Sequence, residues 1–183
     1  MRITAGKHRN RVLKSLTGDV TRPTTDKVKE AVFSKLGTYF DSGRILDLFG
    51  GSGAISLEAI SRGYDSALIV EKNRSACNVI NENVSLLKES DNVTIWNCSY
   101  TSAISRLKEA GDSFDLIYAD PPYRFNIGNE LVELIGGSDL LKTDGYLILE
   151  TLKEEEIKES DDLYIEKQAL YGITKITYLR RRK

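Results

Sequence analysis

The sequence predicts an α/β protein built on a mostly parallel seven-stranded sheet, with helices on both faces and an antiparallel hairpin at its C-terminal end. Two observations lead to this prediction. Short apolar runs alternate with helical periodicity after residue 43, and the last two apolar runs follow each other directly. Strands separated by helices form right-handed βαβ units, and their strands are therefore parallel neighbours. The chain has 183 residues, 40% of them hydrophobic and 29% charged, and we expect one domain.

The N-terminal residues differ from this pattern and predict a small basic β-hairpin within residues 1–22. Residues 2–6 and 11–13 have strand character and are joined by residues 7–10. Asp26 then suits the first turn of a helix. Val28, Val32 and Leu36 repeat every four residues, which predicts a helix of about 12 residues that ends near Gly37.

The rest of the chain alternates between strands and helices. The predicted strands are Ile45–Leu48, Ala67–Glu71, Val93–Asn97, Phe114–Ala119 and Tyr146–Thr151. The predicted helices lie near residues 54–62, 74–88, 101–110 and 126–135. The runs Leu163–Leu170 and Ile173–Leu179 flank Tyr171-Gly172 and predict the antiparallel hairpin at the edge of the sheet.

The composition argues against several classes of protein. Two cysteines, Cys77 and Cys98, and one histidine, His8, cannot supply a disulfide framework or a four-thiolate zinc site, and we expect no metal. The N-terminus lacks an apolar signal segment, and no uncharged run approaches the roughly 18 residues that a membrane span needs. We therefore expect a cytoplasmic protein that does not associate with membranes.

The net charge of −1 conceals an uneven distribution. Residues 1–36 carry nine Lys/Arg and three Asp/Glu, and the last four residues are all basic, whereas residues 109–166 hold sixteen acids and four bases. Two basic ends on an acidic chain favour a nucleic-acid backbone as partner, with solvated surface charge as the alternative. The candidate RNA-binding residues are Arg2, Lys7, Arg9, Arg11 and Arg22.

A glycine-rich turn follows the first predicted strand. Gly51-Ser52-Gly53 lets the backbone approach a ligand, and the next helix presents free N–H groups there. Asp47 at the strand end suits a cationic, amine-bearing ligand better than a pyrophosphate. Glu71 ends the next strand 20 residues after Gly51, where an acid can accept hydrogen bonds from both ribose hydroxyls. These features predict a nucleoside cofactor, and a purely structural turn is the alternative.

A second motif, Asp120-Pro121-Pro122-Tyr123, follows the strand Phe114–Ala119 at its carboxyl end, the edge where ligands bind in open α/β sheets. The prolines stiffen the turn and remove two N–H donors. The Asp120 side chain and a backbone carbonyl are adjacent acceptors that can hold an exocyclic NH₂ group. Tyr123 supplies a flat face for an extruded base. A rigid turn with a capping Asp is the alternative.

Together the two motifs resemble those of S-adenosylmethionine-dependent methyltransferases that modify exocyclic amines of bases. The whole chain resembles the RsmD family, bacterial methyltransferases of guanine N2 in 16S ribosomal RNA. Further matching segments are Arg2-Ile3, Ala5-Gly6, Thr21-Arg22-Pro23-Thr24 and Leu46–Gly53. The resemblance implies a Rossmann-like class I methyltransferase fold and a single methyltransferase domain over residues 1–183. Within this domain, a basic N-terminal segment at 1–22 precedes the catalytic core at 23–183.

The resemblance also implies the cofactor and the site residues. S-adenosylmethionine is the implied cofactor and S-adenosylhomocysteine the product, with no metal. The implied cofactor-binding residues are Asp47, Phe49, Gly50, Gly51, Gly53, Glu71 and Ser99, and the implied catalytic residues are Asp120, Pro121, Pro122 and Tyr123. The third strand of this superfamily often ends in an Asp that meets the adenine amine, whereas Asn97-Cys98-Ser99 stands here.

The implied partner is 16S rRNA, naked or within an assembling small ribosomal subunit, and we expect a monomer. Three other functions compete with this one. An adenine-N6 or cytosine-N4 DNA methyltransferase could use the same turn. A non-catalytic RNA-binding module could keep the fold, and a nicotinamide-dependent oxidoreductase could use the glycine turn.

Overall fold

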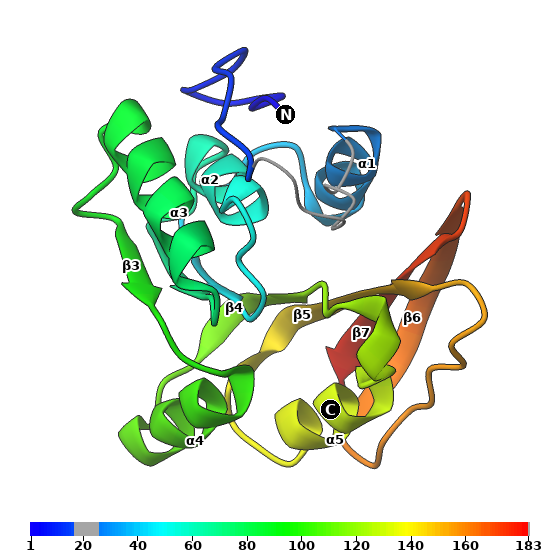
Figure 1. Ribbon diagram of the computed structural model, residues 1–183. Helices are drawn as coiled ribbons and strands as arrows, with labels where there is room; N and C mark the ends of the chain where they lie inside the picture. The colour runs from blue at the N-terminus through cyan, green and yellow to red at the C-terminus, as the bar shows by residue number, and fades with distance from the viewer. Residues whose placement is uncertain (17–25, 183) are drawn as a thin grey trace. The chain divides into compact units, whose positions relative to one another are not determined.

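The computed structural model describes residues 1–16 and 26–182, and the chain divides into two compact units, residues 1–100 and 101–183 (Figure 1). The first unit contains α1 (Asp26–Leu36), β1 (Arg44–Asp47), α2 (Ala54–Ser61), β2 (Ser66–Val70), α3 (Arg74–Leu87) and β3 (Val93–Trp96). Helix α4 (Tyr100–Ala110) begins at the boundary. The second unit contains β4 (Phe114–Ala119), the single 3-10 turn η1 (Tyr123–Phe125), α5 (Gly128–Gly136), β5 (Leu141–Leu152), β6 (Leu163–Tyr171) and β7 (Thr174–Arg181).

The first unit is built on parallel strands, as the alternating pattern predicts. Strand β2 pairs in parallel with both β1 and β3. Helix α2 packs on β1 and β2, and α3 packs on β3. The apolar face of α3 is buried at Ala76, Ile80, Val84 and Leu87, and the Asn73 side chain caps the helix by accepting hydrogen bonds from the first-turn N–H groups. The predicted α1 is also present.

The predicted N-terminal hairpin is present in a short form, with an antiparallel bridge between Arg2 and Val12. The Ile3 N–H donates to the Arg11 carbonyl and the Leu13 N–H to the Met1 carbonyl, both at 2.9 Å. The hairpin is also held by α2. The N–H groups of Thr4 and Ala5 donate to the Glu58 carboxylate, and the Lys7 N–H donates to the Ser61 carbonyl. These contacts fix the hairpin on α2. We call residues 1–16 the arm; Arg22 lies outside the described residues.

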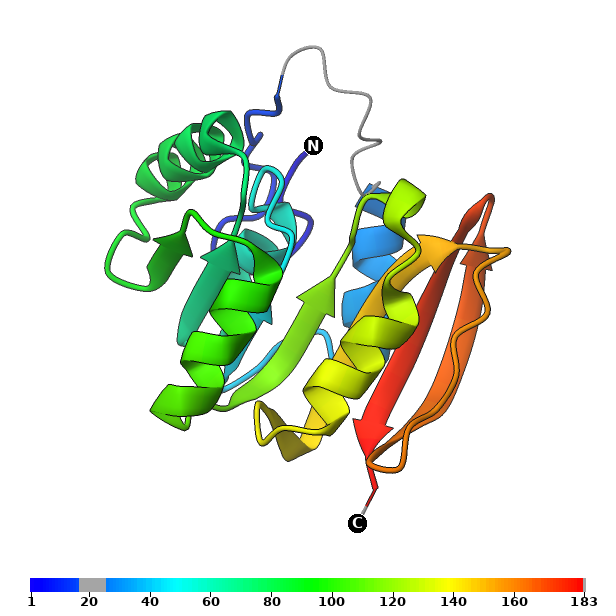
Figure 2. The same ribbon diagram turned by 60° about the horizontal axis from the view of Figure 1, so that its bottom comes forward.

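The second unit is a mixed sheet in the order β4-β5-β7-β6 (Figure 2). Strands β4 and β5 are parallel, and β7 is antiparallel to both β5 and β6, which confirms the predicted C-terminal hairpin. Its turn contains Gly172 at φ +64°, a left-handed conformation that favours glycine. Helix α5 packs on β5.

Two boundaries in this unit differ from the prediction. Strand β5 begins at Leu141, five residues before the predicted start at Tyr146, and β7 continues to Arg181. The basic C-terminal residues are therefore partly strand: Arg180 contacts Glu166, and Arg181 donates to the Leu141 carbonyl. Among the described residues, no helix is both long and apolar enough to cross a membrane.

Candidate functional site

The glycine turn connects β1 to α2 and leaves open space at its tip. Gly51 has φ +55° and Gly53 has φ +79°, conformations that L side chains rarely adopt. A Cβ atom at Gly51 would meet no atom within 4 Å, whereas one at Gly50 would lie 2.3 Å from Cγ2 of Ile69. Gly50 is therefore needed for packing, and Gly51 presents bare backbone to a ligand.

Asp47 lies beneath this turn and is 2% exposed. Its Oδ1 accepts a hydrogen bond from the Phe49 N–H at 3.3 Å, and its Oδ2 accepts one from the Ser56 hydroxyl at 3.2 Å. Burial raises the pKa of Asp47 to about 7, and these hydrogen bonds only partly oppose that effect. Burial thus disfavours the ionised carboxylate, and a cation bound beside it would favour that form.

Glu71 follows β2 and touches the same turn. Its Oε2 accepts a hydrogen bond from the Gly51 N–H at 2.9 Å, and its Oε1 accepts one from the Asn73 N–H at 2.7 Å. A carboxylate offers about four lone-pair sites, so these two bonds leave capacity for sugar hydroxyls. The structure therefore brings together Asp47, the glycine turn and Glu71, which lie up to 24 residues apart in the sequence.

The loop after β3 borders this cluster. Asn97 is turned back toward Glu71, because its Nδ2 donates to the Glu71 and Lys72 carbonyls at 2.8 and 3.0 Å. Ser99 is half-buried in the same loop. The Phe49 ring lies 5.2 Å from the Tyr100 ring, centroid to centroid. Sequence reasoning missed Tyr100, although an aromatic residue directly after Asn97-Cys98-Ser99 was a usable signal.

The Asp-Pro-Pro-Tyr motif belongs to the second unit, directly after β4. Tyr123 begins η1 and is half-buried, and its hydroxyl lies 3.1 Å from the Thr174 hydroxyl at the start of β7. This hydrogen bond fixes the edge of the ring. The motif is thus a stiff turn at the carboxyl end of a buried strand, with an oriented aromatic ring, as the sequence predicts.

The second unit also contains a buried acid, Glu150, that sequence reasoning missed. Glu150 is 4% exposed on β5, and its Oε2 accepts a hydrogen bond from the Tyr118 hydroxyl at 2.6 Å. The signal in the sequence was an acid directly after the apolar run Leu147–Leu149, at a position that a buried strand rarely gives to a charge.

The basic residues of the arm are exposed, but they are not equivalent. Lys7 pairs with the buried Glu89 at 2.7 Å, and Lys14 pairs with Glu82 at 2.6 Å. Arg2, Arg9 and Arg11 are also exposed. Lys7 therefore has a structural role in addition to any contact with RNA, and Arg9 and Arg11 are the better candidates for phosphate contacts.

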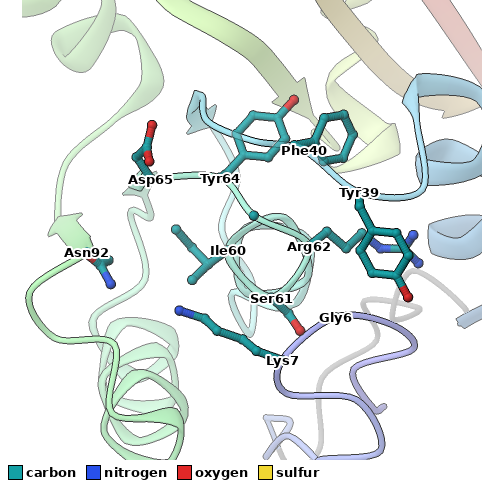
Figure 3. A pocket seen from close by; sticks show the side chains of 11 residues that line it. Gly6, Lys7, Tyr39, Phe40, Ile60, Ser61, Arg62, Tyr64, Asp65 and Asn92 are labelled. Atoms are coloured by element: carbon teal, nitrogen blue, oxygen red, sulfur yellow. The ribbon is translucent and has the colours of Figure 1, made fainter.

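A pocket of about 550 Å³ lies at the C-terminal end of α2, whereas the glycine turn lies at its N-terminal end (Figure 3). Tyr39, Phe40 and Arg62 line it together with Lys7 of the arm. The Arg62 guanidinium in its wall already donates to Glu58 and to the Thr38 carbonyl. In the part of the chain that the structure describes, no group of three or more His, Cys, Asp or Glu side chains is arranged to hold a metal ion.

Known proteins resemble this chain over nearly its whole length. The family model "Conserved hypothetical protein 95" matches residues 1–180. The chain is 34% identical to the "Putative rRNA methyltransferase YlbH" of Bacillus subtilis over 183 residues, which cover 100% of both chains. It is 31% identical to the "Ribosomal RNA small subunit methyltransferase D" of Haemophilus influenzae over 176 residues, which cover 94% of this chain and 90% of the relative.

Solved structures confirm the fold. The "Putative methyltransferase yhhF from Escherichia coli" has a TM-score of 0.83 and 28% identity and covers 100% of this chain and 98% of its own. A Streptococcus mutans protein described as "a putative sam-dependent methyltransferase" is 13% identical, with a TM-score of 0.68 over 84% of this chain and 47% of its own, and so shows likeness in fold alone. The predicted Rossmann-like methyltransferase fold is thus confirmed.

Proposed function

Because the chain belongs to the RsmD family of rRNA methyltransferases, we propose that it transfers a methyl group from S-adenosylmethionine to the exocyclic N2 amine of a guanine in 16S rRNA. The observation that supports this most directly is that each unit holds the groups one reactant needs. Asp47, Gly51 and Glu71 converge in the first unit, and the stiff Asp120–Tyr123 turn lies in the second.

The first unit would bind the cofactor. The buried Asp47 would attract the cationic end of the cofactor, and Glu71 would accept hydrogen bonds from the ribose hydroxyls. The bare backbone at Gly51 would let the ligand approach closely. Phe49 and Tyr100 would pack against the ligand beside the loop that carries Ser99. The bound sulfonium supplies an electrophilic methyl group.

The second unit would hold the target base. Asp120 and the Pro121 carbonyl would accept hydrogen bonds from the two amine hydrogens, which directs the nitrogen lone pair toward the methyl group, while Tyr123 stacks on the base. The N–CH₃ bond forms as the S–CH₃ bond breaks, and the displaced amine proton leaves to solvent. S-adenosylhomocysteine is the other product.

The proposal is tested with methyl-labelled S-adenosylmethionine and 16S rRNA, supplied both naked and in isolated small subunits. The RNA is digested, and the labelled nucleoside is identified by mass spectrometry. We expect N2-methylguanosine. Labelled N6-methyladenosine or N4-methylcytidine would contradict the proposed base, and cofactor binding without transfer to either form of the RNA would favour a non-catalytic module.

Cofactor affinity should depend on pH through Asp47. Because the pKa of Asp47 is raised to about 7, a cation must displace a proton from it at lower pH. Affinity should therefore rise as pH increases from 5.5 to 7, by up to about tenfold per pH unit, and then level off. Calorimetry in two buffers of different ionisation enthalpy should detect proton release. In Asp47→Asn both effects should disappear; if they persist, another group titrates.

Tyr123 should act through its ring more than through its hydroxyl. Tyr123→Ala should raise the activation free energy of methyl transfer by roughly 1–3 kcal/mol, because base stacking is lost. Tyr123→Phe keeps the ring and loses only the hydrogen bond to Thr174, so it should keep much of the activity. Thr174→Val removes the same hydrogen bond from the other side and should match Tyr123→Phe. Equal losses in the Phe and Ala variants, measured as single-turnover rates, would show that stacking is not the role of Tyr123.

The arm should supply salt-dependent affinity for RNA. Replacing Arg9 and Arg11 by Gln should flatten the log–log dependence of RNA affinity on salt by roughly 0.7 to 0.9 per lost phosphate contact. Cofactor affinity should be unchanged. The control replaces Lys142 and Lys153, which are 44% and 48% exposed in the second unit, by Gln. If both double variants change the slope equally, net charge and not the arm determines RNA affinity.

A further inference from the structure

We propose that Glu150 reads the target base, accepting a hydrogen bond from guanine N1–H and thereby excluding adenine and cytosine. This assignment depends on the proposed methyl transfer to guanine. The Asp-Pro-Pro-Tyr turn could hold the exocyclic amines of guanine, adenine and cytosine equally well, so another residue must select among these bases.

The register of β4 with β5, extended by one residue, sets Asp120 level with Glu150. The two strands are parallel, with Tyr118 opposite Ile148 and Ala119 opposite Leu149. The next residue after Ala119 is Asp120, which follows the end of β4, and the next after Leu149 is Glu150, which is still in β5. Alternation along a strand puts Asp120 on the same face as Tyr118, and the hydrogen bond from the Tyr118 hydroxyl shows that Glu150 uses that face.

Tyr123 lies over the same face. Its hydroxyl contacts Thr174, which stands opposite Leu152 in the antiparallel pair of β7 with β5. Leu152 is two residues beyond Glu150 and therefore points to the same side of the sheet. By this register, the ring of Tyr123, Asp120 and the buried Glu150 belong to one face of the second unit, near the ends of β4 and β5.

The chemistry of the three bases differs next to the amine. Guanine presents the N1–H donor beside its N2 amine, whereas adenine and cytosine present a lone pair beside theirs, on N1 and N3. A carboxylate is only an acceptor. Glu150 would therefore accept from guanine and repel the lone pair of the other bases. Because Glu150 is nearly fully buried, an unmatched contact there would be costly, which is how a polar site achieves large discrimination.

The hydrogen bond from Tyr118 would keep the Glu150 carboxylate in place before the base arrives. Tyr118 is itself 1% exposed on β4, so its hydroxyl is held by the packing of the strand. A buried acid with a fixed orientation costs little to organise when the base binds. We therefore treat Tyr118 as a positioning residue and Glu150 as the residue that contacts the base.

The test uses 2-aminopurine, which carries the same exocyclic amine as guanine but has a lone pair at N1. The nucleotide methylated in the mapping experiment above is replaced by 2-aminopurine in ligated 16S rRNA, supplied both naked and in reconstituted subunits. The wild-type protein should methylate the guanosine RNA on the order of 10²-fold faster than the 2-aminopurine RNA. Glu150→Gln should reduce this ratio by at least about tenfold, because the amide NH₂ can donate to N1 of 2-aminopurine.

A matched control comes from the same sheet. Tyr146 donates to Glu166 in a second Tyr–Glu pair, and Glu166→Gln should leave the ratio at the wild-type value. Thermal unfolding and cofactor affinity should be unchanged in both Gln variants. If Glu150→Gln does not fold, Tyr118→Phe carries the test, since it removes a hydrogen bond that orients the carboxylate and should also lower the ratio.

An unchanged ratio in a folded Glu150→Gln or Tyr118→Phe variant would overturn the inference and leave Glu150 with a structural role alone. Failure of the proposed function has a different signature. In that case the wild-type protein would not methylate the guanosine RNA in either form.

Discussion

Replacement of Asp120 by Ala is expected to slow methyl transfer by about 10²-fold or more while cofactor affinity changes by no more than a few fold. Asp120 would hold the target amine, and a small misplacement of a reacting atom is enough for a loss of about that size. Asp47 and Glu71, the proposed cofactor residues, are held by hydrogen bonds to Phe49 and Gly51 in the first unit. Single-turnover rates and calorimetric titration of S-adenosylmethionine measure the two effects separately.

The control for this variant is Asp115→Ala. Asp115 is on the same strand, but its exposed carboxylate pairs with Lys142 at 2.9 Å, so its loss should leave the rate within about twofold. A parallel loss of rate and cofactor affinity in Asp120→Ala would contradict the assignment and place Asp120 among the cofactor ligands. Loss of the rate alone supports amine binding.

The elements of the sheet were largely predictable, because buried parallel strands appear as short apolar runs. Strand β4 has the bounds that the sequence predicts, Phe114–Ala119. The first half of β5 was missed because Lys142, Thr143 and Asp144 are exposed and polar, so no apolar run marks them. The pairing of β4 with β5 is also irregular there, with a register shift between Phe114 and Leu116.

The candidate site was predictable where chemistry and local conformation coincide, as in the glycine turn and the Asp-Pro-Pro-Tyr turn. Glu150 has a local signal, as an acid directly after an apolar run, but its place one residue beyond the Ala119–Leu149 pair depends on strand register and not on spacing in the sequence. The same holds for Asn97, whose side chain could not be assigned to the Glu71 carbonyl without the geometry of the loop. Such contacts between distant segments have no local signal.

The anchoring of the arm is a further feature that the sequence did not reveal. Glu58 on α2 is fully buried, and its carboxylate accepts hydrogen bonds from Thr4 and Ala5 of the arm and from Arg62. It also pairs with Lys29 of α1, itself fully buried, at 3.2 Å. Lys29 donates in turn to the Arg2 carbonyl. One carboxylate thus joins α1, α2 and the arm, which explains how so short a hairpin is held in the first unit.

The Glu58 carboxylate should remain charged across the neutral pH range. Burial raises its pKa, but the hydrogen bonds from Thr4 and the charge of Lys29 outweigh burial, and the pKa lies below its ordinary value. A lowered pKa in the folded state contributes stability that is present above the pKa of the unfolded chain and is lost as pH falls through the folded value. The arm should therefore stay anchored at neutral pH and loosen only in acid.

Glu58→Ala should consequently destabilise the first unit by about 3–5 kcal/mol, because it leaves the buried Lys29 and Arg62 without their shared carboxylate. Denaturant unfolding measures the loss, and hydrogen exchange should show faster exchange at the Thr4 and Ala5 amides. The control is Glu82→Ala, since Glu82 also pairs with the arm, through Lys14, but is 52% exposed and should contribute less than about 1 kcal/mol. If the two variants lose similar stability, the buried carboxylate does not anchor the arm, and the apolar contacts of Ile3 and Leu13 must hold it instead.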